Sequence, residues 1–270
     1  MIKNRILVPT NFSAQAEIAF KQSVFFSAKT GADIYLLHII QNIKAVDKSA
    51  YDIETIQNKL NKIADKYSSE TGAKIHTRIE GGRIISNILN IEKEIKPSYI
   101  FIGTDVSEKV RASTTLRLIS QVDCPIVVFA GKFQKSGCEN IVLPLDLTKE
   151  TKQKIDETIK IAKIYNSTVH IVSATNFSDE IERDKLTSQI MMVKSVFDKL
   201  DINCKTELFK TKNDISVMAN TINDYADDIN ADLIVIMTRQ ETKIQKFFVG
   251  SMANILIRQS NVPILCISPK

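Results

Sequence analysis

The stretch Arg5–Ser13, RILVPTNFS, recurs past the middle of the chain as Asn140–Thr148, NIVLPLDLT. Two further pairs of segments repeat in the same order: Tyr99–Thr104 with Leu233–Thr238, and Cys124–Val128 with Val262–Cys266. Self-similarity at a nearly constant offset is the signature of a duplicated unit, here of about 130 residues. We therefore expect one domain over residues 1–131 and a second over 138–270, joined by the polar, glycine-containing segment Gly131–Cys138.

Each copy alternates short apolar runs with longer amphipathic stretches. Runs such as Ile6–Val8 are apolar throughout, which is typical of parallel strands covered on both faces. Ser13 is expected to cap a helix that Gly31 ends. The first copy predicts strands at 5–9, 33–40, 74–79, 99–103 and 125–130, with helices at 13–30, 50–70, 84–95 and 112–121. The second copy predicts strands near 140–145, 168–174, 203–209, 232–238 and 263–268. This alternation indicates the α/β fold class, with two tandem, doubly wound, five-stranded parallel-sheet domains.

Composition excludes several classes of protein. Hydrophobic residues make up 44% and charged residues 25%, as in soluble globular chains. No apolar run approaches the roughly 20 residues of a membrane span, and the N-terminus does not resemble a secretory signal, so we expect a cytoplasmic protein. Residues 1–135 hold 19 Lys and Arg against 13 Asp and Glu, a net charge of +6. Arginine and aromatic residues do not cluster, so no nucleic-acid groove is expected.

Motifs of several enzyme classes are missing from the sequence. Neither G-x-G-x-x-G after a strand, nor G-x-x-x-x-G-K-[ST], nor G-x-S-x-G occurs. The four cysteines and three histidines show no metal-ligand spacing, so no metal site is expected. No general base is evident beside the expected ligand site, and we expect no catalytic residues.

A ligand of an open parallel sheet binds beyond the carboxyl ends of the strands, where the strand order reverses. The turns at that edge are Thr10–Phe12 and Gly103–Asp105 in the first copy, and Leu145–Leu147 and Met237–Arg239 in the second. The helices that follow begin near Ser113 and Ser251, and helix N-termini attract anions but also favour serine as an ordinary cap. His38 ends the second strand, where a satisfied histidine at a sheet edge is favoured over a ligand contact. For Glu80–Arg83 a glycine turn is favoured over an anion-binding loop.

Taken together these features resemble the universal stress protein family in tandem form. The resemblance rests on the two opening strands, the LLHII strand, Gly81–Gly82, and the closing segments YIFIG…ASTTLRLISQVDCPIVVF and LIVIM…GSMANILIRQSNVPILCIS. It implies five-stranded domains that pair through their last strands, so that a tandem chain forms an internal pseudo-dimer. It also implies that ATP is a possible ligand, with Mg2+. The family's pattern is Gly, two residues, Gly, nine residues, then Gly and Ser or Thr, with an Asp after strand one.

Each copy carries an incomplete form of that pattern. The second copy keeps Asp146, Gly250 and Ser251, but Met237 and Gln240 replace the first two glycines. Arg239 and Lys243 are available to supply positive charge in their place. The first copy has Asn11 at the acidic position, keeps Gly103, and ends in Ala112–Ser113 after a loop about four residues short. The candidate binding residues are Asn11, Gly103 and Ser113 in the first copy, and Pro144, Leu145, Asp146, Ser173, Thr238, Arg239, Gly250 and Ser251 in the second.

The sequence therefore predicts a stress-response protein with a partly degenerate adenine-nucleotide site, better kept in the second domain. The alternative is a nucleotide-free structural or interaction protein of the same fold, and a slow hydrolase or phosphotransferase is the third possibility. The expected partners are the two domains themselves, paired within one chain, and a second copy of the chain in a homodimer. No nucleic-acid or membrane partner is expected.

Overall fold

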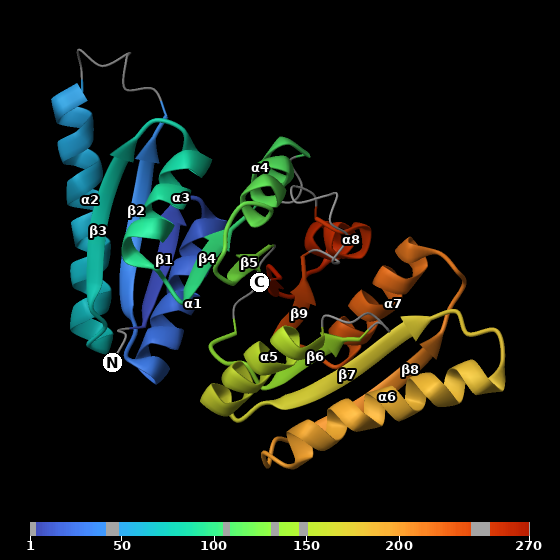
Figure 1. The fold of residues 1–270 in the computed structure, drawn as a ribbon. Helices are drawn as coiled ribbons and strands as arrows, with labels where there is room; N and C mark the ends of the chain where they lie inside the picture. The colour runs from blue at the N-terminus through green and yellow to red at the C-terminus, as the bar shows by residue number, and fades with distance from the viewer. Residues whose placement is uncertain are drawn as a thin grey trace. The chain divides into compact units, whose positions relative to one another are not determined.

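The computed structural model describes residues 4–41, 49–104, 109–130, 135–145, 151–238 and 249–269. The chain divides into two compact units, Met1–Gln134 and Lys135–Lys270. In the described residues, each unit contains five strands and four helices in strict alternation (Figure 1). Every strand pair with a described register is parallel, which confirms the predicted α/β class. No helix in the described part of the chain is both long and apolar enough to span a bilayer.

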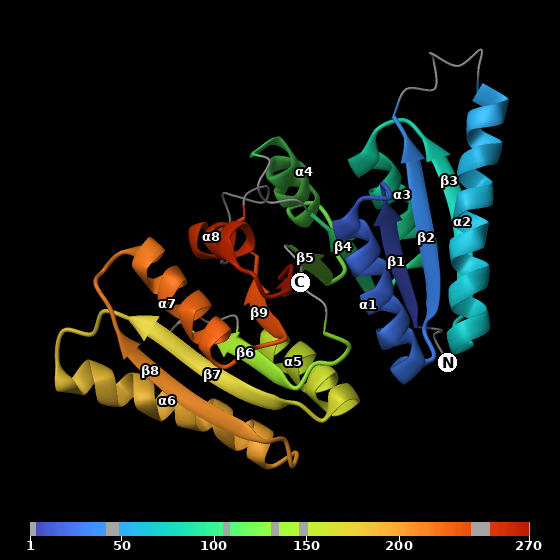
Figure 2. The ribbon, with the colours of Figure 1, turned by 180° about the vertical axis from the view of Figure 1, so that it is seen from behind.

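The first unit is a parallel sheet with helices on both faces. Its strands are β1 (Arg5–Thr10), β2 (Asp33–Ile40), β3 (Ile75–Gly81), β4 (Tyr99–Gly103) and β5 (Ile126–Phe129), in the order β3-β2-β1-β4-β5. Its helices are α1 (Ala14–Thr30), α2 (Ser49–Thr71), α3 (Ile84–Ile95) and α4 (Lys109–Ile119). Helices α1 and α2 cover one face and α3 and α4 the other, so α3 lies in front in Figure 1 and α1 in front in Figure 2. The strand order reverses between β1 and β4.

The second unit repeats this plan. Its strands are β6 (Asn140–Pro144), β7 (Thr168–Thr175), β8 (Cys204–Lys210), β9 (Leu233–Met237) and β10 (Ile264–Ile267), in the order β8-β7-β6-β9-β10. Its helices are α5 (Thr151–Tyr165), α6 (Glu180–Asp198), α7 (Ile215–Asp228) and α8 (Ser251–Gln259). The reversal falls between β6 and β9, which is the position that β1 and β4 hold in the first unit.

Local chemistry explains where the elements begin and end. Ser13 accepts a hydrogen bond from the Ala16 amide, 3.3 Å from Oγ, and starts α1. Gly31 ends α1 in the left-handed conformation, with φ of 68°, and its amide donates to the Ser27 carbonyl. The central strands are buried on both faces, and Ile6–Val8 has no exposed surface. This burial is the reason that the strands are apolar throughout rather than alternating.

Candidate functional site

The first unit contains a cleft of about 650 Å³ at the carboxyl ends of its strands. The cleft lies at the reversal of strand order, where open parallel sheets bind ligands. The lining comes from the ends of β1, β2 and β4, from the turn after β1, and from α1, α2, α3 and α4. The lining residues are Pro9, Thr10, Asn11, Ser13, Ala16, Leu37, His38, Ile39, Ile40, Gln41, Ile56, Ile84, Ile88, Ile102, Gly103, Thr104, Thr114 and Thr115.

The lining is mostly aliphatic, with polar groups at its rim. Six isoleucines contribute to it, and none of the lining residues is an acid. Ile88 is fully buried, and Leu37 is 1% exposed, so the floor belongs to the core of the unit. Ligand pockets commonly have this character, in which apolar surface provides burial and a few polar groups fix orientation.

At one rim of the cleft, His38 is held by two contacts. Its Nδ1 lies 2.9 Å from the Thr10 carbonyl oxygen, which only accepts, so Nδ1 carries the proton. Its ring stacks on Phe12 with 4.8 Å between centroids, and the Lys59 ammonium lies 4.1 Å from the centroid of Phe12. Phe12 adopts a φ of 60°, which turns the chain sharply after β1. His38 lines the cleft, and its Nδ1 already has a hydrogen-bond partner within the protein.

Two of the predicted first-copy residues have structural partners. The Asn11 Oδ1 accepts from the Ser13 amide at 3.1 Å, so Asn11 closes the turn that leads into α1. Gly103 lies against the backbone of α1: a Cβ there would be 2.1 Å from both the carbonyl carbon and oxygen of Gln15. The structure thus gives Gly103 a packing role. Ser113 lies in α4, and its side chain is outside the described residues.

The second-copy residues lie around the ends of β6 and β9, and several are inside the protein. Thr238 has no exposed surface, and its Oγ1 donates to the Ile267 carbonyl at 3.2 Å. Ser173 in β7 is 1% exposed and Leu145 is 7% exposed. The Gly250 amide donates to the Thr238 carbonyl at 2.9 Å, which joins the start of α8 to the end of β9. These contacts account for Thr238 and Gly250 without a ligand.

Other members of the predicted set are exposed or lie outside the described residues. Ser251 is the exposed first residue of α8. Pro144 ends β6, and its carbonyl accepts from the Lys154 ammonium at 2.6 Å. Asp146 and Arg239, as well as Gln240 and Lys243, are outside the described residues.

Three positively charged residues that contact a strand end or line a cavity were not predicted as site residues. Lys154 is 7% exposed on the inner face of α5, one turn before the buried Thr158. Helical spacing from the buried Thr158, Ile161 and Ala162 is the sequence signal that identifies this inward position. Arg83 and Arg117 line a second cavity of about 470 Å³ beside the start of α3. Gly82, next to Arg83, has a φ of 115°, consistent with the favoured glycine turn.

No group of three or more His, Cys, Asp or Glu side chains is arranged for a metal ion within the described part of the chain. Burial raises the pKa of the Cys124 thiol, with a further contribution from the Glu92 charge. Burial alone raises the pKa of Cys266. Thiols held protonated in this way are poor nucleophiles.

The two halves define a duplicated α/β protein, and the first half has a cleft at its strand-order reversal. The model of the Universal stress protein family matches residues 3–130 and again residues 137–268. The chain belongs to the universal stress protein family, in tandem form.

Sequence and structure relatives agree with this assignment. Two universal stress proteins of Methanocaldococcus jannaschii are each 23% identical, one over 143 residues (48% of this chain, 81% of the relative) and the other over 169 (60% and 96%). The crystal structure of a universal stress protein from Archaeoglobus fulgidus has a TM-score of 0.76 at 17% identity, covering 99% of both chains. A protein of unknown function from Pseudomonas aeruginosa PAO1 has a TM-score of 0.70 at 17% identity, covering 99% of this chain and 93% of its own.

Proposed function

We propose that this tandem universal stress protein is a cytoplasmic stress-response protein that binds an adenine nucleotide, with its base and ribose in the cleft of the first unit. The observation that carries the proposal is the 650 Å³ cleft at the reversal of strand order. Its aliphatic floor suits the faces of a flat base, and Thr10, Asn11 and Gln41 at the rim offer hydrogen bonds to a sugar or a base edge.

The fit to the rest of ATP differs between its parts. The cleft has room and polar groups for a nucleoside. The glycine that the family pattern assigns to phosphate, Gly103, is already against the α1 backbone, where its lack of a side chain is needed for packing. When bound, Mg2+ would neutralise phosphate charge, and none of the residues lining this cleft is an acid that would hold it.

The second unit remains a proposed second site. It would use Asp146 for the ribose, and Gly250, Ser251 and Arg239 for phosphate, as the sequence pattern predicts. Lys154, whose ammonium donates to the Pro144 carbonyl, adds a positive charge at the end of β6. We also propose that the two halves pair through their last strands, as the tandem family match supports. Protection of β5 and β10 amides from hydrogen exchange in the whole chain tests the pairing, and sedimentation tests for a homodimer.

A matched pair of variants on α2 tests the first cleft. Ile56 lines the cleft, whereas Ile53, one turn earlier on the same helix, is 42% exposed and does not line it. Isothermal titration with adenosine, AMP and ATP, each with and without Mg2+, is expected to show binding that Ile56→Trp abolishes and Ile53→Trp preserves. Because the chain has no tryptophan, either variant also provides a fluorescence signal.

The same titrations decide between the halves. Loss of binding in Asp146→Ala, with Ile56→Trp unaffected, assigns the nucleotide to the second unit. Equal loss in both variants indicates two sites. No binding of any of these ligands by the wild-type chain would reject the proposal and favour the nucleotide-free interaction protein. That alternative is supported by the internal hydrogen bonds of Thr238 and the packing role of Gly103.

A further inference from the structure

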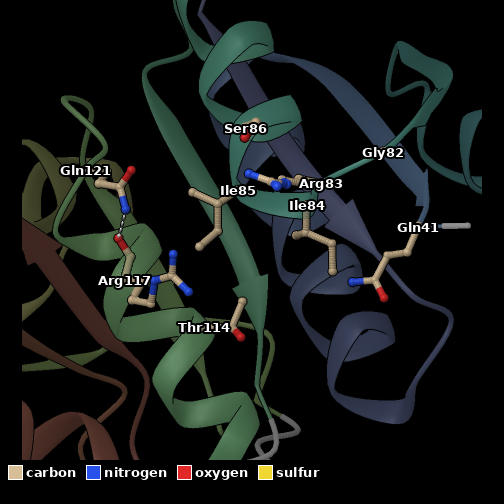
Figure 3. Close-up of a pocket in the computed structure, with 9 residues that line it drawn as sticks. All are labelled: Gln41, Gly82, Arg83, Ile84, Ile85, Ser86, Thr114, Arg117 and Gln121. Carbon is tan, nitrogen blue, oxygen red and sulfur yellow. Dashed lines mark hydrogen bonds between the residues drawn. The ribbon is translucent and has the colours of Figure 1, made fainter.

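A second cavity of about 470 Å³ adjoins the first cleft in the first unit. Three residues line both spaces, namely Gln41, Ile84 and Thr114. The remaining lining is Gly82, Arg83, Ile85, Ser86, Arg117 and Gln121 (Figure 3). The shared residues make the two spaces neighbours, of which one is mostly aliphatic and the other is lined by two arginines.

The two arginines come from different elements and face the same cavity. Arg83 immediately precedes α3, and Arg117 lies in the last turn of α4. Figure 3 shows the Arg117 side chain extending from α4 toward the start of α3, where Arg83 lies. In the part of the chain that the structure describes, neither guanidinium has an ion-pair partner. The nearby acid Glu80 is paired with Arg78 at 2.7 Å, so it does not neutralise them.

The start of α3 adds hydrogen-bond donors to this cavity and no negative charge. No side chain caps the start of α3, and its first turn contains no acid. The cavity lining contains no Asp or Glu. Two guanidinium groups without a carboxylate, supplemented by free amide hydrogens, favour a group with several acceptor oxygens and a negative charge.

We propose that this cavity binds the phosphate group of a nucleoside monophosphate whose nucleoside lies in the adjoining cleft. The inference rests on the proposed function for the cleft and adds the place and the chemistry of the anionic group. Arg83 and Arg117 donate to the phosphate oxygens, and Thr114 and Gln41 lie where the two parts of the ligand meet. The phosphate then lies at the start of α3 rather than in the loop after β4.

The test compares AMP with adenosine in the wild-type chain, Arg83→Gln, Arg117→Gln and the double variant. The wild-type chain is expected to bind AMP at least about tenfold more tightly than adenosine, because charge-assisted hydrogen bonds are the stronger ones. Each single variant is expected to reduce that ratio, and the double variant to abolish it while leaving adenosine affinity unchanged. Arg258→Gln on α8, which removes an exposed arginine bonded to Asn254, is the charge-matched control and is expected to change nothing.

Separate outcomes distinguish this inference from the proposed function. If AMP and adenosine bind equally and the arginine variants match wild type, the anion site is rejected while the nucleoside cleft stands. If neither binds, the proposed function fails, and the cavity is tested with inorganic phosphate alone. Phosphate-induced shifts in the NMR resonances of residues at the start of α3, absent in the double variant, would support the anion site. The absence of such shifts in the wild-type chain would reject it. If octyl phosphate binds arginine-dependently and AMP does not, the nucleoside assignment is rejected.

Discussion

Replacing Gly103 by alanine tests how closely α1 packs against the end of β4. An ideal Cβ at this position lies 2.1 Å from the carbonyl carbon and oxygen of Gln15 and 2.5 Å from the amide nitrogen of Ala16. Favourable contacts between carbon atoms begin at about 3.5 Å, so the overlap exceeds roughly 1 Å. The atoms in the way are backbone atoms in the first turn of a helix, and rotating a side chain cannot relieve the overlap.

The expected cost follows from the kind of movement required. Overpacking a well-packed site costs about 1–3 kcal/mol, and more where backbone must shift. Moving the start of α1 also disturbs the Ser13 cap and the turn after β1. We therefore expect Gly103→Ala to lower the free energy of unfolding of the first unit by about 3 kcal/mol or more. With a urea dependence of about 1.5 kcal/mol per molar, the midpoint falls by about 2 M.

Urea titration followed by far-ultraviolet circular dichroism measures this change, since the chain lacks tryptophan. Gly137→Ala is the control, because its Cβ would meet nothing within 4 Å and its φ is not positive. That variant is expected to stay within about 1 kcal/mol of wild type, on the stabilising side. A midpoint for Gly103→Ala within 0.3 M of wild type, a change of about 0.5 kcal/mol, would refute the packing role of this glycine.

Four further predictions concern buried polar groups and thiols. Burial lowers the pKa of His170 from its ordinary 6.5, so the stability due to the neutral ring is complete above about pH 6.5 and is lost as the pH falls toward the lower pKa of the folded state. The urea midpoint of the wild-type chain should therefore drop between pH 7.5 and 5.5, and His170→Gln should reduce that drop. An equal drop in His170→Gln would contradict the assignment to His170. Tyr225→Phe removes the hydroxyl 2.8 Å from the His170 Nδ1 and should cost about 1–2 kcal/mol by thermal denaturation, an effect that would be absent if water replaced it. Glu92 is 7% exposed, and its carboxylate accepts hydrogen bonds from the backbone amides of Asp123 and Cys124 at 2.8 Å. Glu92→Ala should therefore lower the free energy of unfolding by about 2–4 kcal/mol, and Glu92→Gln should lower it clearly less. Equal losses in the two variants would contradict the importance of these hydrogen bonds. Burial raises the pKa of the Cys204 thiol to about 11 and also raises the pKa of Cys266, which is 1% exposed. Mass spectrometry should therefore detect alkylation of Cys204 in the folded chain as the pH approaches 11, and alkylation of Cys266 only after unfolding. Labelling of Cys266 in the folded chain at pH 7 would contradict its burial.

The duplicated fold was predictable because its signals are local. Uniformly apolar runs mark strands buried on both faces, and residues such as Ser13 and Gly31 mark helix ends through their own backbone chemistry. Because the unit is repeated, each of these signals occurs twice in the chain. The comparison with the family and the described strand order confirm the predicted fold class.

The site was less predictable, because its residues meet only in three dimensions. The family pattern made Gly103 a candidate binding residue, and only the structure shows that the α1 backbone lies against it. Ile56 belongs to α2, which does not follow β1 or β4 directly, and Arg117 lies in the last turn of the helix after β4; no motif singles out either residue. Thr238 has the residue type and position of a ligand contact, and only burial shows that its hydroxyl is used internally.

The location of the cations predicts that anion binding by the two halves would respond differently to ionic strength. Arg83 and Arg117 are exposed, whereas Lys154 is enclosed and its ammonium donates to the Pro144 carbonyl. Dissolved salt screens exposed charges over about 8 Å at physiological concentration and acts much less on enclosed ones. If the first half binds an anion through these arginines, the affinity is expected to fall as potassium chloride is added, whereas an anion bound near Lys154 is expected to lose less of its affinity. A salt series on the unmodified chain can separate the two halves without any mutation.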